Sequence, residues 1–466
     1  MVTFQPVQAQ RWDIFAGFAA TLNSADARDE LRAWCGLGLV ALAIAGIFAL
    51  LVALSRVPGI ENLSLLPVAF FEKGLVVHVI FSFVVWYLSI LGSLTTVVAY
   101  RIGGGKPPGK TLAWTAIFCG YGASIMLFVP GLMDGGEPIL NNYIPVISDT
   151  LYYIGLAVLA LAFVLSVVRL FLCLPQRVGP LEPVSLGTIN ASFLFLLAGV
   201  CFALALSGLI KMPADEYFFE NLFWGGGHVL QFVNVAMMIT AWYLLGGLAF
   251  GKPLVNPHFL LLAQALLCAA ALMAPLFYFL FETFGFAQTI AFTRLQYAFV
   301  LPTILIGIMG LRTWSKVSPE KSHIGGKCLV ASIVVFGFGG LLGLFVDGAD
   351  TRTPAHYHGV IGGINLSFMG LFYVFFLPLI GRDLEPVRSV TLSIWFYATG
   401  QILHVAGLFM AGGYGAPRKT AGEAQGIEEL GAKIALYGMG VGAVIAVIGG
   451  VMFIWIAGRA LIGRNL

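Results

Sequence analysis

Two histidines one residue apart, His356 and His358, stand at the start of a long apolar stretch of the sequence. Successive residues of an α-helix are offset by about 100°, so side chains at positions i and i+2 point about 200° apart. If the stretch is helical, these two imidazoles cannot bind one metal ion. They can serve two different partners, one on each side of the helix, and imidazole is a common metal ligand.

Composition places these histidines in a membrane protein. Of the 466 residues, 59% are hydrophobic and only 10% are charged, which is far from the usage of soluble domains. Apolar stretches of about 20 residues, long enough to cross a ~30 Å hydrocarbon core, recur along the chain. We therefore expect an all-α membrane protein with twelve transmembrane helices, forming a single domain over 1–466 with a cytoplasmic N-terminal segment at 1–32. The expected spans are 33–55, 74–100, 111–131, 148–172, 184–210, 222–249, 259–281, 291–311, 328–346, 355–381, 390–412 and 434–458.

The basic residues predict the orientation of these spans. An even number of spans puts both termini on one side of the membrane. That side holds 17 of the 25 Lys and Arg residues, so the positive-inside rule makes both termini cytoplasmic. The net charge of +3 then reflects topology, and we expect membrane lipid rather than nucleic acid as a partner.

Four histidines in three different spans are expected at one depth, in the exterior half of the bilayer. His78 lies early in the second span, His228 early in the sixth, and His356 and His358 open the tenth. Polar groups inside a membrane are rare and need partners, so this convergence favours ligand binding. His404, in the eleventh span, is expected to serve helix packing instead. The six cysteines form no CxxC or CxxCH motif, which predicts no disulfide framework, zinc site or covalently attached haem.

These features resemble the catalytic subunit of the haem–copper oxidase superfamily, which includes oxygen reductases and nitric oxide reductases. "AHYHGVIG" (355–362) resembles the family's histidine pair on its tenth helix, "GLVVHVIF" (74–81) its second helix and "GFGGLLG" (337–343) its ninth. The resemblance implies two haems, for which we expect b-type. His356 would bind the high-spin haem, and His78 and His358 the low-spin haem. "GAPRKTAG" (415–422) resembles the loop whose basic pair contacts haem propionates, a role that would fall to Arg418 and Lys419.

The sequence departs from the family at the second metal. "NLFWGGGHVLQFVN" (221–234) resembles the family's sixth helix, and His228 holds its metal-ligand position. The tyrosine that is crosslinked to this histidine in many members corresponds to Phe232. The family's adjacent histidine pair is replaced by Glu282 and Thr283. Copper prefers several imidazoles or soft ligands, so we do not expect copper here. His228, Glu282, Thr283 and Gln231 could hold a non-haem iron or line a metal-free polar pocket, and we favour the pocket.

Proton delivery also differs from that of a pumping oxidase. No Asp or Glu is found in the cytoplasmic half of any expected span, and buried acids there would mark a proton route. This argues against strong proton pumping. Protons for the chemistry would instead come from outside, past Glu282, Asp347 and Asp350. For each of these acids the alternative is an ordinary residue of an exterior loop.

Two classes of function remain open. The first is a redox enzyme, nitric oxide reductase-like or an atypical cytochrome oxidase, that reduces a small gas, NO or O2. The second is a non-catalytic haem subunit for electron transfer or gas binding in a larger respiratory complex. Transport without a cofactor is disfavoured by the histidine pattern. We expect an electron-donating partner subunit with c-type haem or copper, and a location in the cytoplasmic membrane of a prokaryote.

Overall fold

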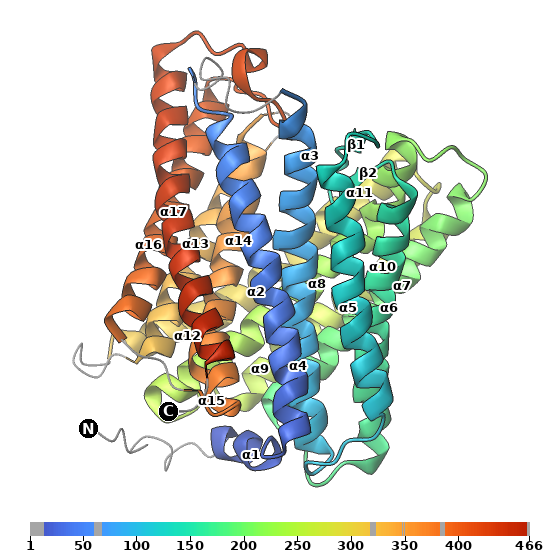
Figure 1. The fold of residues 1–466 in the computed structure, drawn as a ribbon, viewed down its shortest axis with the longest axis vertical. Helices are drawn as coiled ribbons and strands as arrows, with labels where there is room; N and C mark the ends of the chain where they lie inside the picture. Colours follow the sequence, from blue (N-terminus) through green and yellow to red (C-terminus); the bar gives the residue numbers. More distant parts are fainter. Residues whose placement is uncertain are drawn as a thin grey trace.

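Long apolar helices packed side by side make up most of the described chain (Figure 1). The computed structural model describes residues 14–59, 68–316, 323–346, 348, 350–382 and 387–463. Within those residues, twelve helices are long and apolar enough to cross a membrane, and each matches one of the expected spans. The prediction of a twelve-helix all-α membrane protein is therefore confirmed.

Some of the twelve spans are divided into shorter helical segments, and several contain a turn of a different helix type. The α-helices are α1 (Ile14–Thr21), α2 (Ala25–Leu54), α3 (Val68–Val79), α4 (Trp86–Ile102), α5 (Lys110–Leu132), α6 (Thr150–Cys173), α7 (Pro183–Leu209), α8 (Glu216–Phe250), α9 (Pro257–Ala271), α10 (Met273–Leu280), α11 (Phe286–Leu295), α12 (Val300–Trp314), α13 (Ile324–Leu342), α14 (Arg352–Leu371), α15 (Leu377–Leu379), α16 (Val387–Gly413) and α17 (Leu430–Ile462). Two π-helical turns, η2 (Ile80–Val85) and η7 (Phe372–Phe376), continue α3 and α14. The remaining short segments are the 3-10 turns η3 (Leu174–Gln176), η4 (Gln296–Phe299), η6 (Gly343–Phe345) and η8 (Gly422–Gln425).

Three spans form the centre of the bundle. We compared how much of the apolar stretch of each span is buried inside the structure. The buried share is 94% in Glu216–Phe250, 83% in Arg352–Leu379 and 72% in Phe71–Ile102, and at most 44% in every other span found in the described residues. Polar and ionisable residues inside a membrane are costly, and they almost always face the interior of the helix bundle. These three central spans carry His228, the pair His356 and His358, and His78, so the expected site residues lie on the helices that are most shielded from lipid.

A short hairpin closes one end of the bundle between α5 and α6. Strand β1 (Pro138–Ile139) pairs antiparallel with β2 (Val146–Ile147), with Pro138 opposite Ile147. The turn between the strands is held by Asn141, whose side-chain oxygen accepts hydrogen bonds from the backbone N–H groups of Tyr143 and Ile144. This turn directs the Tyr143 side chain toward α8, as described below.

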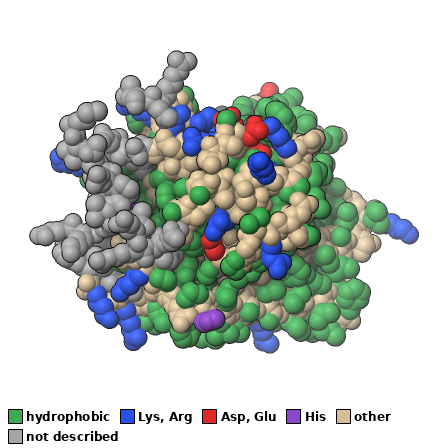
Figure 2. All heavy atoms as spheres, turned by 90° about the horizontal axis from the view of Figure 1, so that it is seen from below, with side chains coloured by type: hydrophobic (Ala, Val, Ile, Leu, Met, Phe, Trp, Pro, Cys, Tyr) green, Lys and Arg blue, Asp and Glu red, His purple; other side chains and the backbone are tan. Residues whose placement is uncertain are grey.

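The opposite end of the bundle carries α1 and the last turn of α17 (Figure 1). Seen from that end, Lys and Arg side chains are scattered over the surface, and hydrophobic side chains gather at its right and lower edges (Figure 2). Trp455 and Ile462 of α17 are among the exposed apolar residues, at 69% and 85% exposure. An apolar perimeter of this extent is expected of a surface that lies against lipid.

Candidate functional site

His78 and His358 face one another between α3 and α14. Their ring centres lie 6.4 Å apart and the ring planes differ by only 15°. Nδ1 of His78 lies 3.1 Å from the backbone oxygen of Ala45 on α2. A carbonyl oxygen can only accept, so Nδ1 carries the proton and Nε2 is left free as a ligand atom.

His358 has no such anchor. Among the described residues, it makes ring contacts with His78, Tyr357 and His404 but no hydrogen bond. A polar ring inside an apolar bundle normally has a polar partner. Two imidazoles that share one metal at about 2 Å each would have ring centres about 6 Å apart. The separation and the unpartnered ring therefore fit a bis-imidazole haem iron between the two residues.

His404 is a third imidazole beside this pair. Its ring centre lies 5.0 Å from that of His358, with the ring planes at 80°, and Nδ1 lies 3.2 Å from the Met439 backbone oxygen of α17. The sequence assigned His404 to helix packing, because it has no H-x-H partner and no clear role in the family. Within the described chain, no group of three or more His, Cys, Asp or Glu residues is arranged to hold a metal ion. His404 thus lies beside the pair and does not complete an ion-binding cluster.

His356 points to a different helix from His358. Its Nδ1 lies 2.8 Å from the backbone oxygen of Gly339 on α13. Gly343 is tightly packed here, since a Cβ atom added to it would lie 2.6 Å from His356 Nδ1. The two helices also touch at Gly339 and Gly359, where a Cβ on either residue would lie within 2.7 Å of the other helix's backbone. The glycines of "GFGGLLG" therefore make room for His356 on the face opposite the His78–His358 pair.

His228 is buried on α8 and both of its ring nitrogens are in use. Nδ1 lies 2.7 Å from the Trp224 backbone oxygen, and Nε2 lies 2.9 Å from the hydroxyl of Tyr143. The same hydroxyl accepts a hydrogen bond of 3.1 Å from Nε2 of Gln296. Burial raises the pKa of the Tyr143 hydroxyl, which keeps it protonated as the donor to His228. Gly227 permits this approach, because a Cβ there would lie 2.5 Å from the Tyr143 ring.

Tyr143 and Gln296 are site residues that sequence reasoning missed. Tyr143 lies in a loop, and helical spacing cannot relate a loop residue to a histidine 85 positions away. The residues expected beside His228 are placed differently: Glu282 and Thr283 lie in the exposed turn between α10 and α11, and Gln231 is half-buried on α8. Among the described residues, no hydrogen bond or ring contact joins any of these three to His228.

Basic residues gather at the end of the bundle nearest these histidines. Arg418 is half-buried, and Nζ of Lys419 donates a hydrogen bond to the backbone oxygen of Leu140 in the hairpin. Burial lowers the pKa of Lys419, whose backbone is left-handed at φ 60°, an uncommon conformation for a residue other than glycine. The hydrogen bond from Lys419 to Leu140 therefore fixes the loop 415–422, which resembles a propionate-binding loop, to the hairpin.

Of the acids expected on an exterior proton route, Asp350 is firmly held. It is 8% exposed, and its carboxylate oxygens lie 2.6–3.0 Å from the Arg352 guanidinium. Burial raises the pKa of Asp350, but the bonds from Arg352 outweigh burial and the net pKa is lowered. Asp347 lies outside the described residues, and Glu282 is exposed as noted above.

The first long helix begins earlier than expected and includes a buried acid, Glu30. Helix α2 begins at Ala25, eight residues before the expected start of the first span, because Ser24 caps its N-terminus by accepting a bond from Ala27 N–H. This places Glu30 inside the helix, where it is fully buried. Charged residues near its start hid the true beginning of the helix in the hydropathy pattern.

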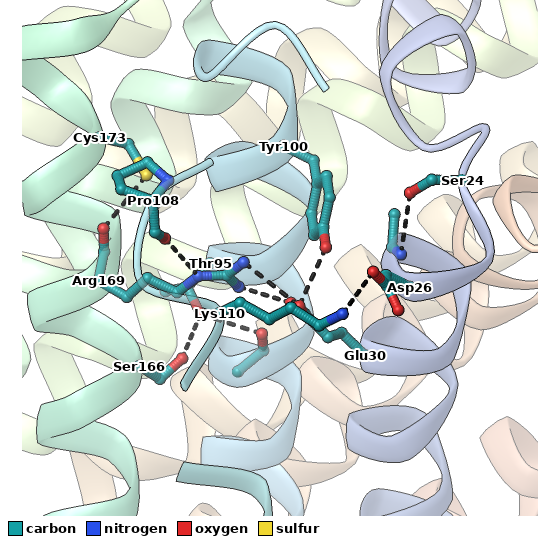
Figure 3. A network of polar contacts seen from close by, with 12 residues as sticks. Ser24, Asp26, Glu30, Thr95, Tyr100, Pro108, Lys110, Ser166, Arg169 and Cys173 are labelled. Atoms are coloured by element: carbon teal, nitrogen blue, oxygen red, sulfur yellow. Dashed lines mark hydrogen bonds and ion pairs between the residues drawn. The ribbon is translucent and has the colours of Figure 1, made fainter. Parts of the chain in front are cut away.

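Glu30 is part of a buried polar network between α2, α4 and α6, shown in Figure 3. Its carboxylate oxygens lie 2.6 and 3.3 Å from the two terminal nitrogens of Arg169, and it accepts a 3.0 Å hydrogen bond from the Tyr100 hydroxyl. Nε of Arg169 donates to the Pro108 backbone oxygen at 3.1 Å. Because both carboxylate oxygens are occupied, Glu30 is placed to join three helices rather than to carry protons.

Comparison with known proteins shows the family and the fold to which this chain is similar. Residues 31–452 match the family model described as cytochrome c and quinol oxidase polypeptide I. An uncharacterised protein of Rickettsia prowazekii (strain Madrid E) is 26% identical over 492 residues, covering 92% of this chain and 95% of the relative. An uncharacterised protein of Aquifex aeolicus (strain VF5) is 29% identical over 375 residues, covering 78% of this chain and 90% of the relative. A solved haem–copper terminal oxidase dimer has the same fold, with a TM-score of 0.75, 16% identity, and coverage of 95% of this chain and 85% of that one.

Proposed function

The chain belongs to the family of cytochrome c and quinol oxidase polypeptide I, and we propose that it is a dihaem respiratory membrane subunit that reduces NO or O2. The observation that carries this proposal is the facing pair His78 and His358, with ring centres 6.4 Å apart. A haem with two protein ligands carries electrons, whereas a haem with one leaves an axial position for a small gas. Both haems are proposed to be b-type.

The two histidines of the tenth span take different roles in this proposal. His358, with His78, holds the electron-carrying haem. His356 holds the gas-binding haem on the other side of α14, and its bond from Nδ1 to the Gly339 oxygen orients the ring and leaves Nε2 as the ligand atom. Because one short helix segment carries both residues, the two haems would lie close together, as electron transfer requires.

The second site is proposed to be a polar pocket without copper. His228 is occupied through both nitrogens by Trp224 and Tyr143, which supports a metal-free site over a bound iron. The family's crosslinked tyrosine is absent, since Phe232 stands at its position. Tyr143 instead brings a phenol to the same histidine from the hairpin loop, and Gln296 fixes the position of its hydroxyl.

Electrons and protons are proposed to arrive from outside this chain. A partner subunit with c-type haem or copper would donate the electrons. Protons would enter past the exterior acids Glu282, Asp347 and Asp350. Of these, Asp350 is bound by Arg352 through both carboxylate oxygens and would line the route rather than carry protons. Both termini would lie on the cytoplasmic side of a prokaryotic membrane. Glu30 does not restore a pumping route, since Arg169 and Tyr100 occupy both of its carboxylate oxygens.

The test is an optical spectrum of the purified, reduced chain with and without CO. We expect a six-coordinate low-spin haem together with a second haem whose spectrum shifts when CO binds. A chain that purifies without haem contradicts the proposal. Low-spin haem with no response to CO at any concentration would favour the second candidate, a non-catalytic electron-transfer subunit, in which His356 holds no gas-binding haem.

A further inference from the structure

Arg56, just after the end of α2, is a buried cation that forms no ion pair with an acid in the part of the chain that the structure describes. Its side chain is 8% exposed. One terminal nitrogen donates to the backbone oxygen of Pro417 at 2.9 Å, while Nε is buried and has no hydrogen-bond partner. No Asp or Glu of the described chain forms an ion pair with it. Burial lowers the pKa of Arg56 to about 10, so the group remains charged at neutral pH.

The loop that follows α16 holds Arg56 in this position. Nε2 of Gln425 donates to the Arg56 backbone oxygen at 3.1 Å, and the Gly422 N–H donates to the Ser55 backbone oxygen at 3.1 Å. Together with the bond to Pro417, these contacts fix both the backbone and the side chain. An unpaired buried charge costs several kcal/mol, so a fold that fixes one in place is expected to provide it with an anion.

The surroundings of Arg56 contain further positive groups and the histidine site. Arg56 is close enough to His358 and His404 for its charge to act on both rings. The positive charges of Arg56 and Arg418 both act electrostatically on Tyr357. Arg56 follows Ala45 of α2 by eleven residues, about 16 Å along a helix, and the Ala45 backbone oxygen accepts a hydrogen bond from His78. Arg56 therefore stands over the edge of the His78–His358 site.

We propose that Arg56 binds a carboxylate of the haem held by His78 and His358, an inference that rests on the proposed function. A guanidinium binds carboxylate through two parallel hydrogen bonds, and the unpartnered Nε of Arg56 is available for one of them. Lys419 is less available for this role, because its Nζ already donates to Leu140. The primary anchor is thus on the first span, and the loop residues Arg418 and Lys419 assist it.

The experiment is a potentiometric titration of the low-spin haem in the purified full chain, comparing Arg56→Gln with Arg312→Gln. Arg312 is exposed at the opposite end of the bundle, so its replacement removes the same charge far from the site. Loss of a nearby cation favours oxidised haem. For Arg56→Gln we expect the reduction equilibrium to shift about tenfold toward the oxidised form, about 59 mV for one electron. Arg312→Gln should leave the midpoint unchanged, and equal midpoints in the two variants overturn the proposal.

If Arg56→Gln does not fold, the variant Arg56→Lys tests whether Arg56 binds the haem carboxylate. A buried lysine has a lowered pKa and loses its charge as pH rises. The Lys variant should therefore show a midpoint that falls more steeply between pH 7 and pH 10 than that of the wild type, and identical pH profiles contradict the proposal.

An anionic lipid headgroup is the other source of such an anion. Loss of bound anionic lipid from Arg56→Gln with an unchanged midpoint would indicate lipid and overturn haem binding. Wild-type protein without haem would instead refute the proposed function itself.

Discussion

The hydroxyl of Tyr143 lies 2.9 Å from Nε2 of His228, although the two residues come from a hairpin loop and a central helix. Nδ1 of the same histidine is bound to the Trp224 carbonyl, so the imidazole is fully hydrogen-bonded by the protein. His228, which we propose corresponds to a metal ligand of the family, is here part of a hydrogen-bonded chain through Tyr143 to Gln296. A metal could reach His228 only by displacing one of these partners.

Replacing Tyr143 by Phe should destabilise the protein. The change leaves a buried imidazole nitrogen and the Gln296 amide without a partner, which costs about 1–3 kcal/mol. Thermal unfolding in detergent measures the loss. Tyr297→Phe is the matched control, because Tyr297 is 66% exposed and its loss should change little. Equal unfolding midpoints for the two variants would show that the bond from Tyr143 to His228 does not stabilise the fold.

Metal analysis should give about two irons per chain and no copper, as expected for two haems beside a metal-free pocket. Glu282→Ala should leave this content unchanged, because Glu282 is exposed and His228 already has protein partners at both nitrogens. A third iron that disappears in Glu282→Ala would contradict the metal-free site. So would one copper per chain that is lost in His228→Ala.

The buried pair Glu30 and Arg169 should couple strongly in a double-mutant cycle. Glu30→Met alone leaves the guanidinium, 4% exposed, buried without its anion, at a cost of about 3–5 kcal/mol. The double variant Glu30→Met with Arg169→Met should recover most of this loss, since apolar pairs often replace buried ion pairs without penalty. Asp26→Asn, which breaks an exposed pair with Lys110, serves as the control. A double variant as unstable as the sum of the single ones would refute the coupling.

Asp350 should contribute to stability in a pH-dependent way. Its pKa is lowered in the folded protein, because the Arg352 bonds outweigh the effect of burial. The contribution is therefore present above the unfolded pKa, near 3.9, and is lost as pH falls through the folded value. Asp350→Asn should destabilise the protein by about 1–3 kcal/mol at pH 7, and the difference should shrink below about pH 4. A stability difference that is constant from pH 7 to pH 3.5 would contradict this account of the Asp350–Arg352 pair.

The fold and the shared depth of the histidines could be predicted because both follow from span length, whereas the pairing of His78 with His358 was implied by the family resemblance. His78 and His358 lie together because the second and tenth spans are central, and their depth followed from counting residues along each span. Tyr143 could not be predicted, since its position depends on a hairpin turn and on the lack of a side chain at Gly227. Glu30 was missed for a different reason. Charged residues in the first turns of α2 lower the mean hydropathy of that segment, so the expected span began after them. The ion pair of Glu30 with Arg169 allows the helix to include this residue.

His404 and Arg56 show a second limit of sequence reasoning. Both lie beside His358, yet one comes from α16 and the other from the end of α2, and no motif joins either of them to the histidine pair. Their proximity results from how α16, α17 and α2 pack, which hydrophobic pattern alone does not specify. Residues that approach a site from neighbouring helices are therefore the part of the site that requires a structure.

The most direct test of the central claim is the reduced optical spectrum of His78→Ala compared with that of His404→Ala. Both variants remove an imidazole next to His358, so any general disturbance of the site should affect both. The account predicts that the six-coordinate low-spin signal disappears in His78→Ala, because the haem loses an axial ligand, and persists in His404→Ala. A low-spin signal that is unchanged in His78→Ala would contradict the pairing of His78 with His358.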